Sequence, residues 1–202
     1  YLNEMSKIAI HHGGTIDKYI GDAIMIFFGD PDTLGEKEDA IACLRMAIEM
    51  RKRLVEMRRE WVAMGVTTPL RIRMGVNTGF CTVGNFGSEE RLDYTIVGST
   101  VNLASRLEGL AEVDEILIAE DTFALVNEVI KCEERGEVRM KGLAYPVKTF
   151  QVIDAYETIQ HESEQLKAQL KGFNLSIDFD ELNYTDKLYA KELLQKAMSK
   201  LD

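Results

Sequence analysis

A lysine and an aspartate stand four residues apart in a glycine-flanked stretch near the start of the chain. Lys18 and Asp22 lie in the segment GGTIDKYIGDAIMIFFG, whose apolar residues predict two short strands, at 15–20 and 24–28, joined by a tight turn at Gly21. A carboxylate at the tip of such a hairpin, close to an ammonium group, is a place where a divalent cation and a phosphate-bearing ligand can meet. The alternative is an ordinary surface hairpin with an aspartate in its turn.

Two further segments carry side chains that suit a phosphate and a sugar. Arg73 lies in an alternating strand predicted at 70–76, where a guanidinium either clamps phosphate oxygens or faces the solvent. Asn102 and Arg106 are four residues apart in a helix predicted at 99–110, so they stack on one face. An asparagine and an arginine near a helix start can reach a sugar and a phosphate together, although a solvated helix face is the common alternative.

The composition of the chain limits the classes of partner. The 202 residues carry a formal net charge of −10, which argues against binding to duplex nucleic acid because such proteins normally present a basic face. A hydrophobic content of 46% is enough for a folded domain with a core. The three cysteines are widely spaced and predict neither a disulfide framework nor a zinc site, which favours a cytoplasmic location. The sequence contains no signal peptide and no membrane-spanning apolar run, but it starts within an apparent helix and leaves an upstream membrane segment open.

Elements of both kinds must position these side chains. The sequence patterns predict, in chain order, a helix at 1–12, the hairpin, a helix at 36–64, strands at 70–76 and 80–84, a polar loop at 85–90, a strand at 93–97, a helix at 99–110, a strand at 115–119, a helix at 121–130 and paired strands at 138–142 and 147–152. Methionines in the long helix recur at helical spacing and are predicted to fill the core. Because several strands join by short turns, we expect an α+β fold with a mixed or antiparallel sheet.

The composition changes at about residue 155, which divides the chain into a first domain at 1–154 and a C-terminal tail at 155–202. In the tail we expect a polar helix at 157–171, ended by Gly172, and a second helix at 184–201 with one apolar face. The tail is therefore predicted to be a helical accessory or linker element.

Four segments in this order resemble the catalytic domain of the class III nucleotidyl cyclases, of the bacterial adenylate cyclase type. The resemblance covers residues 1–154, and its segments are KYIGDA at 18–23, RMGVNTG at 73–79, residues 93–106, and Lys141-Gly142. It implies a ferredoxin-like, palm-type mixed sheet with helices packed on it. It also implies a lyase that converts ATP to 3′,5′-cyclic AMP and pyrophosphate.

The resemblance implies a role for each matched residue. Asp22 matches one of two aspartates that hold two divalent cations, Mg²⁺ or Mn²⁺, on the ATP phosphates. Arg73 and Lys141 match residues that contact the triphosphate. Asn102 matches the residue that orients the ribose, and Arg106 matches the residue that stabilises the transition state.

Lys18 and Thr95 match the pair of residues that selects the base. A lysine donates to N1 of adenine, and a threonine hydroxyl can accept a hydrogen bond from the exocyclic amine. A guanylate cyclase typically carries an acidic residue and a cysteine at this pair, so adenine is favoured. Many members of the family have an aspartate at the position of Thr95, and the departure is mild because bacterial members also carry a hydroxyl there.

Two properties of the family concern groups beyond this sequence. Members begin with a central strand that carries the second metal-binding aspartate, and no such segment precedes Tyr1, so we expect a chain that truly begins there to be inactive. The family's active site forms at a head-to-tail dimer interface, so the resemblance implies a homodimer with two equivalent sites. One copy would supply Asp22 and Arg73, and the other would supply Lys18, Thr95, Asn102, Arg106 and Lys141. Phe80 and Phe86 are candidates for that interface or for the core.

Two alternatives to an adenylate cyclase stay open at this point. The first is a guanylate cyclase, which would use the same fold and the same reaction on GTP. The second is a non-catalytic module that binds nucleotide or dimerises and so regulates an attached domain, because the first metal-binding aspartate is missing from the sequence. An upstream regulatory or membrane domain is compatible with each of these functions.

Overall fold

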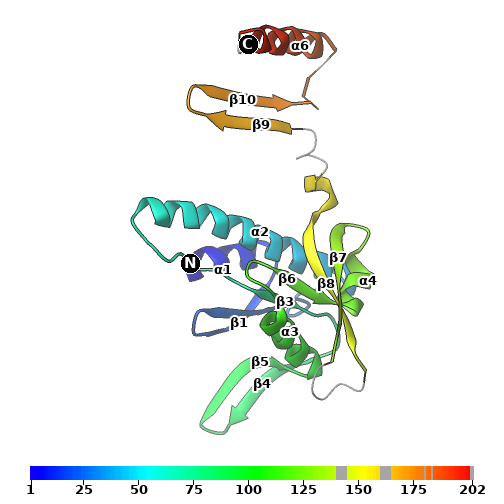
Figure 1. Ribbon diagram of the computed structural model, residues 1–202. Helices are drawn as coiled ribbons and strands as arrows, with labels where there is room; N and C mark the ends of the chain where they lie inside the picture. The colour runs from blue at the N-terminus through cyan, green and yellow to red at the C-terminus, as the bar shows by residue number, and fades with distance from the viewer. Residues whose placement is uncertain (140–144, 160–164, 180, 183, 201–202) are drawn as a thin grey trace. The chain divides into compact units, whose positions relative to one another are not determined.

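The computed structural model describes residues 1–139, 145–159, 165–179, 181–182 and 184–200, which fall into two units (Figure 1). The first unit is Tyr1–Ala155 and the second is Tyr156–Asp202. All the residues predicted to carry chemistry belong to the first unit.

A mixed sheet of four strands is the largest sheet of the first unit. Its order is β3 (Met74–Val76), β6 (Ile116–Ala119), β8 (Val147–Ala155) and β7 (Ile130–Val138). Strand β3 runs parallel to β6, whereas the other two pairs are antiparallel. The helices that cover the sheet are α2 (Glu36–Ala63), α3 (Ser99–Leu110) and α4 (Glu120–Val126). The predicted α+β fold with helices on a mixed sheet is confirmed.

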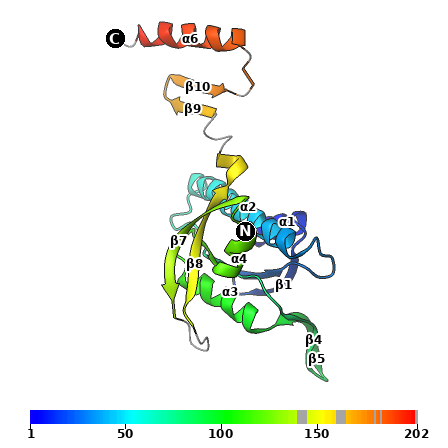
Figure 2. The same ribbon diagram turned by 90° about the vertical axis from the view of Figure 1, so that its right-hand side faces the viewer.

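Strand β6 is buried on both faces, and this requires a helical layer on each side. Ile116 and Ile118 belong to the core cluster that contains residues of α2 and α4. Leu117 and Ala119 alternate with them and therefore face the other side, where they pack with Leu107 of α3. In both views α2 and α3 lie on opposite sides of the strands (Figures 1 and 2).

A second core cluster joins the N-terminal helix and hairpin to α2. Helix α1 (Leu2–His11) precedes the hairpin of β1 (Thr15–Ile20) and β2 (Ala23–Phe27), as predicted from the sequence. The buried members of the cluster are Met5, Ile8, Ala9, Met46, Met50 and Met57, with Ile16, Ile24 and Ile26 of the hairpin packed against them. Met50 and Met57 thus fill the core as expected, whereas Met64, just after the end of α2, is exposed.

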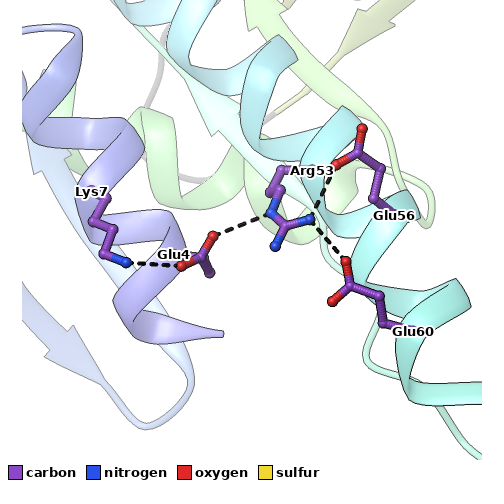
Figure 3. A network of polar contacts seen from close by, with 5 residues as sticks. All are labelled: Glu4, Lys7, Arg53, Glu56 and Glu60. Atoms are coloured by element: carbon purple, nitrogen blue, oxygen red, sulfur yellow. Dashed lines mark hydrogen bonds and ion pairs between the residues drawn. The ribbon is translucent and has the colours of Figure 1, made fainter. Parts of the chain in front are cut away.

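Polar contacts also join α1 to α2 (Figure 3). The Arg53 guanidinium donates to carboxylates of Glu4 at 3.2 Å, Glu56 at 3.1 Å and Glu60 at 3.2 Å, and Lys7 contacts Glu4 at 3.1 Å. The Lys7 and Arg53 hydrogen bonds lower the pKa of Glu4. Because these side chains are solvated, we expect the network to orient the helices more than to stabilise them.

The strand predicted at 70–76 is shorter in the structure because other groups occupy its first carbonyls. Arg58 Nε donates to the Leu70 carbonyl at 2.8 Å, and the Asp114 backbone N–H donates to the Ile72 carbonyl at 2.7 Å. The Arg58 guanidinium also donates to both carboxylate oxygens of Asp114, which lowers the pKa of that carboxyl group. Pairing with β6 therefore starts only at Met74.

The prediction of a polar loop at 85–90 is wrong. Strands β4 (Thr82–Ser88) and β5 (Arg91–Val97) form one continuous antiparallel hairpin. Their pairing runs from Thr82–Val97 to Ser88–Arg91. Most of its side chains are exposed or half-exposed, so the hairpin lacks the buried apolar alternation that marks a strand in a sequence. This hairpin and β1–β2 are separate two-stranded sheets.

The end of the predicted helix at 121–130 is also wrong, and residues 140–142 of the predicted strand at 138–142 lie outside the described residues. Helix α4 stops at Val126, and β7 begins at Ile130 and ends at Val138. The register of β7 against β8 shifts twice, between Lys131 and Cys132 and between Glu134 and Gly136. These irregularities interrupt the two-residue period, and β7 is an edge strand whose charged residues face the solvent.

In the second unit, the helix predicted at 157–171 is wrong for residues 165–171, and its residues 160–164 lie outside the described part of the chain. Residues 156–159 are helical, whereas β9 (Gln165–Leu170) pairs with β10 (Phe173–Asp178) across a turn at Gly172. Gly172 has a φ of +85°, which suits a hairpin turn. The second predicted helix is confirmed as α6 (Tyr184–Met198). Within the described residues, no helix is both long and apolar enough to cross a membrane.

Gly75 gives a test of the contact between β3 and α3. A Cβ at this position would lie 2.2 Å from the Ala104 carbonyl oxygen and 2.2 Å from the Glu108 nitrogen, both backbone atoms of α3. We expect Gly75→Ala to lower the free energy of unfolding by about 2–4 kcal/mol, because the helix must move away from the sheet. Chemical denaturation measures this change.

Gly109→Ala, on the same helix, is the matched control. A Cβ at Gly109 meets no atom within 4 Å, so the substitution should leave the stability unchanged or raise it by roughly 0.5–1 kcal/mol through helix propensity. Equal stability of the two variants would contradict the close packing of β3 on α3.

Candidate active site

Asp22 lies at the tip of the β1–β2 hairpin, where its side chain is exposed. Gly21 precedes it with a φ of +65°, a backbone conformation that permits the tight turn. The pKa of Tyr1 is raised mainly by burial and to a lesser extent by the negative charge of Asp22. The position leaves the carboxylate open to a ligand, as the sequence predicts.

Lys18 and Thr95, the predicted base-selecting pair, converge on one carboxylate that the sequence reasoning did not identify. Thr95 lies buried in β5, and its Oγ1 donates to Asp17 Oδ2 at 2.9 Å. Lys18 Nζ lies 3.4 Å from the same oxygen. The structure therefore brings together two predicted residues from distant segments and adds Asp17 to them.

A further contact joins β5 to the segment after β2. The Tyr94 hydroxyl donates to the Asp30 carboxylate, and this hydrogen bond raises the pKa of the tyrosine. Thr15 Oγ1 donates to the Asp30 carbonyl at 2.7 Å. Side chains thus join the two hairpins on which Lys18 and Thr95 lie.

Asn102 and Arg106 are both exposed on α3. Their four-residue spacing places them on one face of the helix, as predicted. Leu107 is fully buried against the sheet and fixes the rotation of the helix. This arrangement leaves the amide and the guanidinium on the side of α3 that a ligand can reach.

The start of α3 is held by the loop that follows β3. Asn77 Nδ2 donates to the Thr100 carbonyl at 3.2 Å, and Thr100 Oγ1 donates to the Phe80 carbonyl at 2.9 Å. The Thr78 backbone N–H donates to Thr122 Oγ1 at 2.9 Å, and Thr122 Oγ1 donates to Thr78 Oγ1 at 3.0 Å. These bonds tie the loop to α3 on one side and to α4 on the other.

Arg73 is exposed immediately before β3, and its guanidinium lies 3.2 Å from the Glu108 carboxylate of α3. Both side chains are close to half exposed, so the ion pair is weak and Arg73 can exchange this partner for a phosphate. Lys141, the second predicted triphosphate contact, lies outside the described residues.

The chemistry of Asp22 suits a magnesium or manganese ion. Such ions usually keep several water ligands and bind through one or two carboxylates together with substrate phosphates. Within the described part of the chain, no group of three or more histidine, cysteine, aspartate or glutamate side chains forms a metal cage. Asp22 therefore fits as one ligand of a cation that also binds a phosphate.

The sequence of this chain is similar to the sequences of known enzymes. Residues 2–154 match the family described as "Adenylate and Guanylate cyclase catalytic domain". The chain is 29% identical over 161 residues to Adenylate cyclase 1 of Rhizobium meliloti (strain 1021), which covers 79% of this chain and 24% of that protein. It is 35% identical over 153 residues to an adenylate cyclase of Anabaena cylindrica, and the match covers 73% of this chain and 28% of that protein. The chain thus spans about a quarter of the length of these curated relatives.

Solved structures share the fold. The adenylyl cyclase CyaB from P. aeruginosa is 56% identical with a TM-score of 0.74, over 76% of this chain and 79% of that one. The guanylyl cyclase Cya2 is 34% identical with a TM-score of 0.71, over 78% of each chain. Helices on a mixed sheet are therefore common to this chain and to cyclases of both base preferences.

Thr122 tests how the loop after β3 is held in place. Thr122→Val keeps the shape of the side chain but leaves the Thr78 N–H without its acceptor, so we expect the free energy of unfolding to fall by about 1–3 kcal/mol. Thr122→Ser keeps the hydroxyl and loses one methyl group, at a cost of about 1 kcal/mol. Thermal and chemical denaturation measure both values, and a valine variant as stable as the wild type would show that the loop does not depend on this bond.

Proposed function

This chain belongs to the family of adenylate and guanylate cyclase catalytic domains, and we propose that it converts ATP to 3′,5′-cyclic AMP and pyrophosphate. The observation that carries the proposal is the convergence of Lys18 and Thr95 on the Asp17 carboxylate. An ammonium group can donate to N1 of adenine, and a hydroxyl can accept from its exocyclic amine. The adenylate cyclases among the relatives support the same substrate.

The reaction is an in-line displacement at the α-phosphorus. The ribose 3′-oxygen forms a bond to phosphorus as its proton leaves, and the bond from phosphorus to the pyrophosphate oxygen breaks. Asn102 positions the ribose so that the 3′-hydroxyl faces the phosphorus. Arg106 donates to the oxygens on which negative charge develops in the transition state. Arg73 and Lys141 hold the β- and γ-phosphates, where the leaving group gathers charge.

Two divalent cations would complete this site, with Asp22 as a carboxylate ligand. When bound, Mg²⁺ or Mn²⁺ neutralises the triphosphate and favours loss of the 3′-hydroxyl proton. The chain's own contribution is a carboxylate held on a tight turn, where it is exposed to the phosphates.

The active site of this proposal lies between two copies of the chain. One copy supplies Asp22 and Arg73, and its partner supplies the base-selecting pair with Asn102, Arg106 and Lys141. Exposed apolar side chains support an interface here: Phe80 is fully exposed, and further large side chains are exposed on β1 and on the β4–β5 hairpin, namely Tyr19, Ile20, Leu92, Tyr94 and Val97. A symmetric homodimer would hold two equivalent sites.

A guanylate cyclase is the second candidate, because the guanylyl cyclase Cya2 shares this fold at 34% identity. A keto group and an N1–H would then face Thr95 and Lys18, which places a donor against a donor at Lys18. The third candidate is a non-catalytic module that binds nucleotide and regulates an attached domain. A single assay separates the three.

The assay measures cyclic AMP and cyclic GMP formed from ATP and GTP with Mn²⁺, on the protein expressed with its natural flanking sequence at concentrations that favour dimers. We expect cyclic AMP to dominate. Arg106→Ala should lower kcat by about 10²–10³-fold without loss of fold, because one transition-state donor is removed. Arg59→Ala, an exposed arginine of α2, should keep the wild-type rate. Product from GTP alone would favour the guanylate cyclase, and no product from either would favour the regulatory module.

Asp22→Asn tests the metal ligand. An amide lacks the charge that the cation requires, so we expect Mn²⁺ binding in the presence of nucleotide to weaken by about tenfold or more and turnover to fall with it. Electron paramagnetic resonance of Mn²⁺ measures the binding directly. Asp32→Asn removes an exposed carboxylate from the next turn of the chain and should leave Mn²⁺ binding unchanged. Equal binding by both variants would exclude Asp22 as a ligand.

A further inference from the structure

We propose that Asp17 sets the base preference of the site by fixing the direction of the hydrogen bond made by the Thr95 hydroxyl. The inference rests on the proposed nucleotide site and assigns a specificity-determining role to a residue outside the Lys18–Thr95 pair. Asp17 does not contact the base in this role; it is a positioning residue that acts through its two neighbours.

A bulge in β1 places the Asp17 carboxylate where it can reach β5. The pairing of β1 with β2 shifts between Ile16 and Lys18, so Asp17 is the extra residue in the strand. Such a bulge interrupts the alternation of side chains and re-aims one of them. The Asp17 side chain has 0% exposure, and its Oδ2 lies 2.9 Å from Thr95 Oγ1. The irregular strand thus buries a carboxylate between the two hairpins.

The bond to Asp17 removes an ambiguity in the chemistry of threonine. A free hydroxyl can donate its proton or accept one, so it can pair with the amine of adenine or with the O6 oxygen of guanine. A carboxylate only accepts, so the Thr95 proton is committed to Asp17 Oδ2. The lone pairs that remain on Oγ1 can accept a hydrogen bond from the amine of adenine, but no proton is left to donate to the keto oxygen of guanine. The hydroxyl is thereby made specific for adenine.

The same carboxylate acts on Lys18. The ammonium group lies 3.4 Å from Asp17 Oδ2 while its side chain is 42% exposed, so it is anchored on one side and open to a ligand on the other. Lysine has only donors, which suit the N1 acceptor of adenine and oppose the N1–H of guanine. One carboxylate therefore holds both of the groups that read the base.

The hydrogen bond from Thr95 and the ion pair with Lys18 account for Asp17 Oδ2 but not for the other carboxylate oxygen. Asp17 Oδ1 is buried and accepts no hydrogen bond from the described residues. A buried acceptor without a donor costs free energy, so a group of this kind calls for an explanation other than packing. Control of the neighbouring hydroxyl and ammonium supplies one.

The test is Asp17→Asn, with the ratio of kcat/KM for ATP to that for GTP as the readout. Unlike a carboxylate, the amide can donate as well as accept, so the Thr95 proton is no longer committed to residue 17 and becomes available to a keto oxygen. We expect the ratio to fall by about tenfold or more. In a Thr95→Val background, the same change should lower the ratio by a smaller factor, because no hydroxyl is left to direct and only the contact of Asp17 with Lys18 is altered. Asp32→Asn is the control and should keep the wild-type ratio.

A purely structural role for Asp17 would lower turnover of ATP and GTP by the same factor, and that result would overturn the inference. Binding of 3′-deoxy-ATP and 3′-deoxy-GTP, which lack the attacking hydroxyl, measures the base preference without turnover. If the protein cyclises neither nucleotide, the proposed function fails, but the binding ratio of Asp17→Asn against the wild type still decides the role of Asp17.

The unaltered protein covers the case in which Asp17→Asn does not fold. Purine riboside triphosphate lacks a group at position 6, and its 6-methoxy derivative carries only an acceptor there. A hydroxyl committed to Asp17 cannot donate to the methoxy oxygen, so we expect ATP to bind best and the methoxy compound to bind no better than the unsubstituted purine. Tighter binding of the methoxy compound would show that the Thr95 proton is free, and the inference would be wrong.

Discussion

Burial of β6 on both faces is the constraint on which the rest of the first unit depends. A strand of four apolar residues with no exposed face needs a layer on each side, and α2 with α4 supplies one while α3 supplies the other. Because α3 packs so closely that Gly75 has no room for a side chain, the position of Asn102 and Arg106 follows from the packing of the core. Because packing fixes which face of α3 is buried, it also fixes the exposed face that carries Asn102 and Arg106.

The parts of the fold that could be predicted are those whose apolar residues recur with one period. The long helix has such a pattern, whereas the N-terminal hairpin could be predicted from its turn glycine and the continuous apolar run of its second strand; both are confirmed. Strand β7 could not be found in this way, because two register shifts and exposed charges hide its alternation. Pairing with β10 likewise overrides helix-forming residues in β9. A sequence pattern reflects interactions between residues that are close along the chain, whereas β7 and β9 form because each pairs with another strand.

The same limit applies to the site. The spacing of Asn102 and Arg106, and the turn that carries Asp22, follow from short-range geometry and could be predicted. Asp17 could not, because its importance comes from a bulge and from Thr95, a residue far along the chain. The one available signal was a second charged residue in a short strand, next to the lysine already singled out. The predicted role of Lys141 stays a prediction.

The two hairpins that carry Lys18 and Thr95 are separate sheets joined by side chains, through the bond from Thr95 to Asp17 and the bond from Tyr94 to Asp30. No backbone ladder runs between these two hairpins, so substitutions at their junction leave both sheets intact. With the roles proposed for Lys18 and Thr95, the choice of base is decoupled from the choice of fold in evolution. A family can then diverge in substrate by point mutation, which agrees with a single architecture that serves both adenylate and guanylate cyclases.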